Sequence, residues 1–83
     1  GELKKTLLTH DGNVRAITVT ASTAAGRTIQ NLTFPPEVII AAVQRTDNSL
    51  VIPDSETVIL AGDMVYLIGK DQGLEYMAKL LEG

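Results

Sequence analysis

Arg45 is the residue with the clearest potential for binding chemistry, because it closely follows the most apolar segment of the chain, residues 38–43. A guanidinium group can donate paired hydrogen bonds to a phosphate or a carboxylate. Small-ligand sites join an apolar lining to a few polar groups, which is what this position offers. An ion pair between Arg45 and Asp47, or another neighbouring acid, explains the same residue equally well. The sequence therefore leaves two roles open for Arg45.

Arg27 is a second cation with two interpretations. It lies near the start of a predicted short helix, where free backbone N–H groups favour an anion. A solvated arginine is the more ordinary outcome, because exposed cations are the rule on protein surfaces.

The remaining residues form no pattern typical of a catalytic site or a metal site. His10 is the single histidine and the chain has no cysteine, whereas a metal site needs three or four ligands at workable spacing. Asp54 and Glu56 lie in a short polar loop, where carboxylates are usually solvated, and no nucleophile motif or phosphate-binding loop is present. We therefore expect no catalytic residue, no metal and no cofactor, and we predict that the chain is not an enzyme.

The charge balance argues against a nucleic-acid surface. The 83-residue chain has seven basic and ten acidic residues, which give a net charge of −3, and the basic residues are scattered along the sequence. Nucleic-acid binding requires clustered positive charge. A small anionic ligand needs only one or two cations, so this class of ligand stays open. No apolar run approaches the roughly 20 residues that cross a bilayer, and we expect a cytoplasmic location.

Hydrophobic periodicity predicts the elements that must position these residues. In chain order they are a strand (14–20), a short helix (26–32), a strand apolar enough to be covered on both faces (38–43), a turn (46–49) with a short returning strand (50–52), a strand (64–69) and a final helix starting near Asp71. The helix carries an apolar stripe typical of packing on a sheet, formed by Leu74, Met77, Ala78 and Leu81. We expect Asp71 to be its N-cap and Glu75 to pair with Lys79.

These elements predict an α+β fold. Strands joined by hairpins form a small, mostly antiparallel sheet, with the short helix after the first strand and the C-terminal helix packed on one face. Residues 1–12 read as a lead-in or linker, and residues 13–83 as one domain. A core this small often gains stability from a partner surface, so a homodimer is expected.

Four features in fixed order resemble the TrkA-C family, the C-terminal lobe of regulator-of-conductance (RCK) domains. They are Gly26-Arg27-Thr28-Ile29 with Leu32, an apolar strand ending in Arg45, Ile52-Pro53 followed by Thr57, and Gly62-Asp63 before a strand that ends at Gly69. The resemblance covers residues 13–82.

The resemblance implies a regulatory domain of a potassium or other monovalent cation channel, transporter or antiporter. Such domains dimerise and follow a Rossmann-type domain or lie within a transporter's cytoplasmic region, so association with the membrane through the parent transporter is expected. Some members bind cyclic di-AMP at the dimer interface. The positions of this chain that match the ligand-lining positions are Ile39, Ile40, Gln44, Arg45, Asp47 and Asn48. A purely structural dimerisation module without a ligand is the alternative function.

Overall fold

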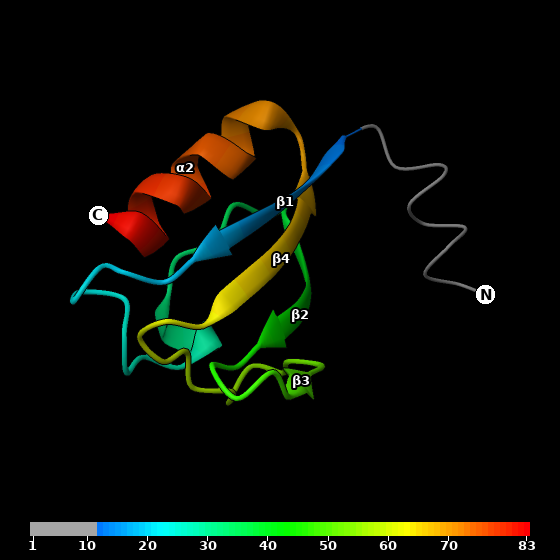
Figure 1. Cartoon of the computed structure of the whole chain (residues 1–83). Helices are drawn as coiled ribbons and strands as arrows, with labels where there is room; N and C mark the ends of the chain where they lie inside the picture. Colours follow the sequence, from blue (N-terminus) through cyan, green and yellow to red (C-terminus); the bar gives the residue numbers. More distant parts are fainter. Residues whose placement is uncertain (1–11) are drawn as a thin grey trace.

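The computed structural model describes residues 12–83, in which a four-stranded antiparallel sheet packs against one long helix (Figure 1). The strands are β1 (Asn13–Thr18), β2 (Ile39–Gln44), β3 (Leu50–Val51) and β4 (Met64–Gly69), and they lie in the order β1-β4-β2-β3. The 3-10 helix η1 (Ile29–Asn31) lies between β1 and β2, and α2 (Asp71–Glu82) follows β4. The predicted α+β class is confirmed. The predicted lead-in and His10 lie outside the described residues, apart from Gly12.

One face of the sheet forms the core with α2. Val65 of β4 lies opposite Ile17 of β1 and Val43 of β2, and all three side chains are buried. Directly paired residues of antiparallel strands point to the same side of a sheet, so these three form one apolar layer. The helix adds Leu74, Met77 and Leu81, which are fully buried as the apolar stripe predicts.

The N-terminal part of α2 differs from the prediction in two details. Lys70 occupies the N-cap position, and Asp71 is the first helical residue, where its Oδ1 accepts a 2.6 Å hydrogen bond from Nδ2 of Asn13. Glu75 pairs with Arg15 of β1 at 3.0 Å, and not with Lys79. Both carboxylates are drawn towards β1 because α2 lies directly against that strand.

The predicted helix over residues 26–32 is largely wrong. Only Ile29–Asn31 forms a helical turn, and Thr28 instead makes a β-bridge with Val58. The backbone N–H groups of Gly26, Ile29 and Gln30 bond to carbonyl groups within residues 55–59, at 2.7 to 2.9 Å. These donors are therefore used in tertiary contacts rather than in a helix. Gly26 has φ of +87°, a turn conformation that glycine adopts without strain.

The β2–β3 hairpin is confirmed, but the prediction that β2 is covered on both faces is not. Val43 pairs with Val51 and Gln44 with Leu50, and the backbone of Arg45 bonds to the carbonyl of Ser49 across the turn. Ile39 keeps 39% of its surface exposed, because α2 and the core cover only one face of the described sheet. Residues Ile40 and Ala42 are separated by a β-bulge at Ala41, which bends the strand.

Candidate functional site

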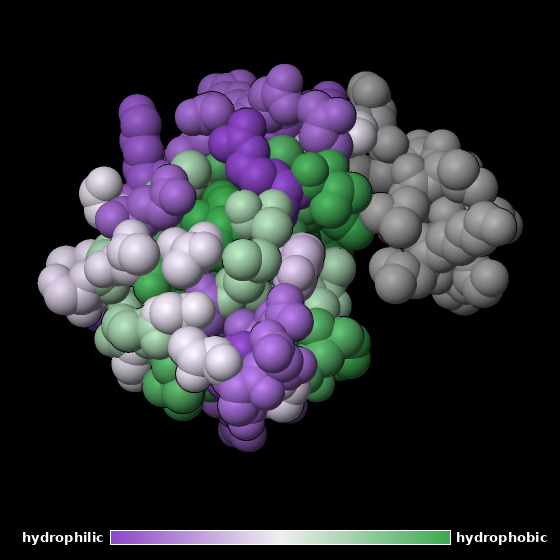
Figure 2. Space-filling model, in the orientation of Figure 1, coloured by the Kyte–Doolittle hydropathy of each residue, from purple (hydrophilic) through white to green (hydrophobic). Residues whose placement is uncertain are grey.

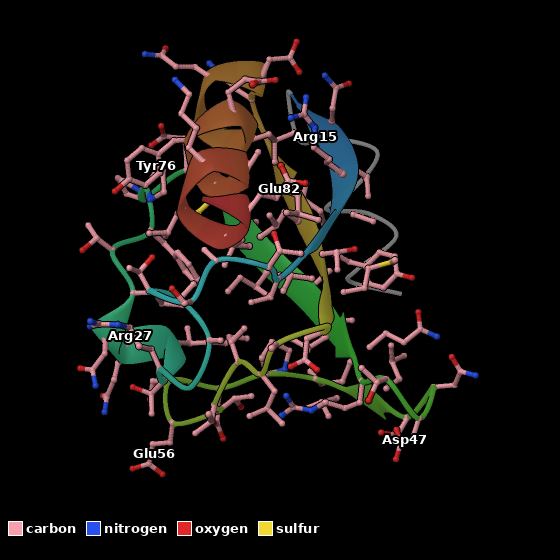
Figure 3. All side chains as sticks on the ribbon, turned by 60° about the vertical axis from the view of Figure 1, so that its left-hand side comes forward. Arg15, Arg27, Asp47, Glu56, Tyr76 and Glu82 are labelled. Carbon is pink, nitrogen blue, oxygen red and sulfur yellow. The ribbon has the colours of Figure 1, made fainter. Side chains whose placement is uncertain are left out.

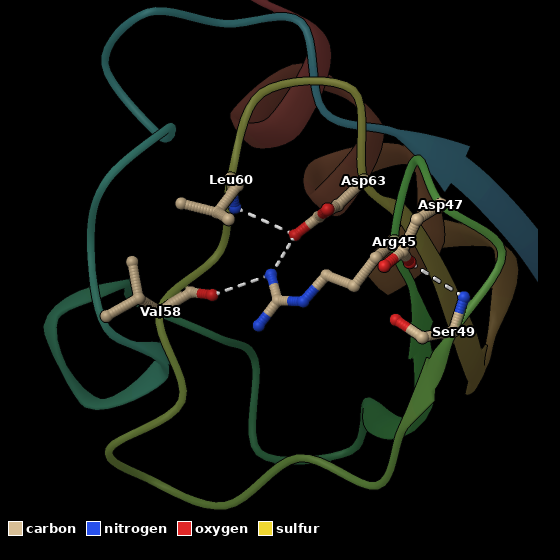
Figure 4. A network of polar contacts seen from close by, with 6 residues as sticks. All are labelled: Arg45, Asp47, Ser49, Val58, Leu60 and Asp63. Atoms are coloured by element: carbon tan, nitrogen blue, oxygen red, sulfur yellow. Dashed lines mark hydrogen bonds and ion pairs between the residues drawn. The ribbon is translucent and has the colours of Figure 1, made fainter.

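Arg45 folds back from the end of β2 and is held in an ion pair. Its Nη1 donates to Oδ2 of Asp63 and, at 3.0 Å, to the carbonyl oxygen of Val58 (Figure 4). The same Asp63 oxygen accepts the backbone N–H of Leu60 at 2.8 Å. Of the two roles left open for Arg45, the ion pair is present in this structure, with Asp63 rather than Asp47 as the partner.

The backbone around Asp63 explains how a carboxylate comes to be buried there. The backbone N–H of Gly62 donates to the carbonyl of Val19, and the N–H of Val19 donates to the carbonyl of Asp63, both at 2.8 Å. Gly62 has φ of +86°, and a Cβ at this position would lie 2.9 Å from Cγ2 of Thr46. The tight turn thus brings Asp63 against the residues that follow β2. Its side chain is 2% exposed, and Arg45 supplies the positive charge that such a carboxylate needs.

The hairpin turn after Arg45 carries Asp47 and Asn48, two of the predicted ligand residues. Figure 3 shows Asp47 at the tip of the hairpin, far from Arg15 beside α2. Oδ1 of Asp47 accepts the backbone N–H of Ser49 at 2.9 Å, and Asn48 has φ of +71°. Hydrogen bonds from the side chain and the backbone of Ser49 lower the pKa of the Asp47 carboxyl. Both side chains are exposed, and the Asp47 negative charge faces solvent next to Arg45.

Ile39, Ile40 and Gln44 do not share one surface. The register places Ile39 opposite Ile68 and Gln44 opposite Met64, on the face of the sheet that points away from α2. Ile40 lies opposite Leu67, on the core face. Oε1 of Gln44 accepts a 2.9 Å hydrogen bond from the Tyr66 hydroxyl, which lies on the same outer face. The six predicted ligand residues therefore divide between the outer face, the core face and the hairpin turn.

The outer face of the sheet is an apolar surface with a polar centre. It is formed by the residues that the register places on the side away from α2: Val14, Ala16, Thr18, Ile39, Ala42, Gln44, Leu50, Met64, Tyr66 and Ile68. Val14 and Leu50 are 61% and 62% exposed, while Ile68 between Val14 and Ile39 is buried. Figure 2 shows apolar surface in several separate places in its view, interrupted by polar residues.

Arg27 lies apart from Arg45. Its Nε donates a 2.7 Å hydrogen bond to the carbonyl of Thr23, four residues earlier, and its side chain lies beside η1 (Figure 3). This contact fixes Arg27 on its own loop, on the opposite side of the molecule from the hairpin tip.

Within residues 12–83, no group of three or more His, Cys, Asp or Glu side chains is placed to hold a metal ion. The same part of a single chain encloses no pocket. No helix among these residues is both long and apolar enough to span a bilayer.

Sequence reasoning missed Asp63 and Tyr66. In the sequence Asp63 is recognisable only as part of a Gly-Asp turn, and because acidic residues are mostly exposed, no local signal marks it as buried and paired. Tyr66 lies two residues after Met64 and two before Ile68, so strand alternation places all three on one face.

Comparison with known families decides the identity of this fold. The TrkA-C domain model matches residues 14–82. The chain belongs to the TrkA-C domain family. The sequence resemblance is thereby confirmed over nearly the same residues.

Solved structures show the same fold. A structure described as an RCK domain with cda superposes with a TM-score of 0.76 at 19% identity, covering 83% of this chain and 97% of the other. The C domain of KtrA, a potassium transport protein and regulator of conductance of K+, was solved with cyclic diadenosine monophosphate. It gives a TM-score of 0.75 at 22% identity, covering 94% of this chain and 93% of its own. No curated protein matches the chain. This TrkA-C domain therefore has the fold of the C domain found in K+ transport regulators.

Proposed function

We propose that this TrkA-C domain is a regulatory module of a potassium or other monovalent cation channel, transporter or antiporter. In this proposal it acts as a homodimer on the cytoplasmic side, binds a small anionic ligand between its two copies, and catalyses no reaction. The proposal rests on the fold match to an RCK C domain that was solved with a cyclic dinucleotide. The match covers 93% of that domain. A preceding Rossmann-type domain or the transporter itself would receive the signal.

The outer face of the sheet is the surface we assign to the second copy. Val14, Ile39 and Leu50 are large apolar side chains that are exposed on it, and they surround the Tyr66–Gln44 hydrogen bond. Apolar residues around an aromatic residue such as the half-buried Tyr66 are typical of interface centres. A site closed by a second copy also agrees with the lack of a pocket in residues 12–83 of one chain.

Ligand binding would act on the attached protein through the arrangement of the two copies. A ligand shifts an equilibrium only by its difference in affinity for the two states. A ligand that contacts Gln44, Asn48 and the free donors of Arg45 across the interface favours the arrangement in which these groups converge. The attached transporter reads that arrangement.

Calorimetric titration with cyclic di-AMP tests the ligand proposal. After the mass in solution has been measured, the expected result is saturable binding of one dinucleotide per dimer. Tyr76→Lys, which changes an exposed aromatic residue on α2, should bind equally well and serves as the control. Absence of heat from a folded dimer would reject this ligand.

The second candidate function is a structural dimerisation module with no ligand. The observation that favours it is the Arg45–Asp63 ion pair, which neutralises the one cation among the six predicted ligand residues. A dimer whose thermal unfolding temperature is unchanged by cyclic di-AMP and by other nucleotides would support this alternative.

A further inference from the structure

Asp63 lies where its carboxylate neutralises the positive charge of Arg45. Its carboxylate is almost wholly buried, it contacts Nη1 of Arg45, and its other partner is the backbone N–H of Leu60. In residues 12–83, Arg45 is the one cationic side chain paired with this carboxylate. An anion that reaches Arg45 therefore meets a guanidinium whose charge is already balanced.

Arg45 nevertheless keeps donors that an anion can use. A guanidinium has five N–H donors, and the hydrogen bonds to Asp63 and Val58 both come from Nη1. Within the described residues, Nε and Nη2 donate to no acceptor, and the Arg45 side chain is 21% exposed. An anion can thus bind the free edge of the guanidinium while Asp63 holds the other edge (Figure 4).

We infer that Asp63 is an affinity-setting residue that weakens anion binding at Arg45. The inference rests on the proposed function and adds a regulatory element to its ligand site. Two anions that share one guanidinium repel each other in a partly buried site, where solvent screens them poorly. The exposed Asp47 carboxylate adds to this repulsion from the hairpin turn, where solvent screens it more strongly.

This arrangement makes the site selective for a ligand with more than one anchoring group. A lone phosphate can accept hydrogen bonds only from the free edge of Arg45, and it is repelled by the Asp63 carboxylate. A ligand with two phosphates and two bases, of the kind bound to the KtrA C domain, adds contacts to the outer face and to the partner copy. Asp63 therefore lowers the affinity for every anion, and only a ligand with these additional contacts still binds tightly.

Asp63→Asn tests the inference, because asparagine can still accept hydrogen bonds from Leu60 and Arg45 but carries no charge. Affinity for cyclic di-AMP is measured by calorimetry, and inorganic phosphate is titrated while the Nε–H resonance of Arg45 is followed by NMR. We expect Asp63→Asn to bind each anion about tenfold more tightly than the wild-type protein. Glu75→Gln makes the same charge change in the remote ion pair with Arg15 and should leave both affinities unchanged.

The outcomes separate this inference from the proposed function. If cyclic di-AMP binds the wild-type dimer and Asp63→Asn binds it equally or less tightly, the inference is wrong and the proposed function stands. If cyclic di-AMP binds neither protein but phosphate shifts the Arg45 resonance at lower concentration in Asp63→Asn, the inference holds and that ligand is rejected. If no anion shifts the Arg45 resonance in either protein, the inference is wrong.

A measurement on the wild-type protein covers the case in which Asp63→Asn does not fold. Saturation with cyclic di-AMP, or titration with phosphate if that ligand does not bind, should move the carboxyl ¹³C resonance of Asp63, because the anion shares its guanidinium partner. A resonance that stays in place while the anion binds would overturn the inference.

Discussion

At the residue scale, the ion pair between Arg45 and Asp63 joins the end of β2 to the turn before β4. Removing one partner of a buried pair leaves an uncompensated charge, whereas replacing both partners by apolar groups is often tolerated. The Asp63 side chain is 2% exposed and the Arg45 side chain is 21% exposed. Substituting Arg45 alone and substituting Asp63 alone should therefore lower the free energy of unfolding by different amounts.

Arg45→Met should therefore destabilise the fold by about 3 kcal/mol, since it leaves the Asp63 carboxylate buried without its cation. The double variant Arg45→Met/Asp63→Leu should recover most of that loss. Urea unfolding of the wild type, both single variants and the double variant gives the coupling energy. Additive effects of the two changes would show that the pair contributes nothing to stability.

Asp47 makes a local contribution that depends on pH. Its pKa in the folded chain lies below the ordinary value of 3.8, first because of the hydrogen bond from the Ser49 side chain. A lowered folded-state pKa means that the stabilisation is present above the unfolded pKa and is lost as the pH falls through the folded pKa. We expect the hairpin turn to loosen only under acidic conditions below that ordinary value.

A carboxyl ¹³C titration of Asp47 checks this expectation. Ser49→Ala removes the side-chain donor but keeps the backbone N–H, so the Asp47 pKa should rise towards its ordinary value. An identical titration curve in Ser49→Ala would mean that the Ser49 side chain does not contribute to the lowered pKa of Asp47.

Sequence patterns could not identify the partner of Arg45. Local charge made Asp47 the obvious candidate, two residues away, but its carboxylate is used within the turn by Ser49. Asp63 lies 18 residues further along the chain, and only the tertiary fold brings it to Arg45. The Gly-Asp turn was visible in the sequence, whereas the contact was not.

At the element scale, periodicity predicted the elements whose hydrogen bonds or packing are regular. The strand 64–69 and the apolar stripe of α2 agree with the structure because alternation and the i, i+3, i+4 pattern directly reflect burial. The helix expected over residues 26–32 failed because its backbone donors bond to residues 55–59. Such long-range pairing leaves no periodic signal in the local sequence.

The junction of α2 with the segment before β2 gives a test of packing. A Cβ on Gly73 would lie 2.7 Å from Cγ2 of Val38, and a valine side chain is too short and stiff to move away easily. Gly73→Ala should destabilise the domain by about 1 kcal/mol or more, despite the better helix propensity of alanine. Thermal or urea unfolding measures the change.

The Val38→Ala background is the matched control for this prediction. With the clash removed, Gly73→Ala should become stabilising, by up to about 1 kcal/mol from helix propensity alone. If Gly73→Ala has the same effect in both backgrounds, contact with Val38 is not the reason for the glycine.

At the scale of the whole molecule, the proposed dimerisation and ligand binding depend on what covers the outer face of the sheet. Ile39→Lys places a charge on this face without touching the core, because Ile39 is already partly exposed. We expect the variant to remain folded but to be monomeric in sedimentation experiments, since a charge buried at an interface without a partner is costly. Tyr76→Lys, on α2, should remain dimeric. A dimeric Ile39→Lys protein would place the interface elsewhere.

The proposed ligand site between two copies is tested most directly by the dimer dissociation constant, measured by sedimentation with and without cyclic di-AMP. A ligand held between two copies must tighten the dimer, because ligand and partner bind the same assembled site and their coupling is reciprocal. We expect a lower dissociation constant for the wild-type chain in the presence of the ligand and no ligand binding by monomeric Ile39→Lys. Ligand binding that leaves the dissociation constant unchanged, or equal binding by the monomeric variant, would contradict the proposed site.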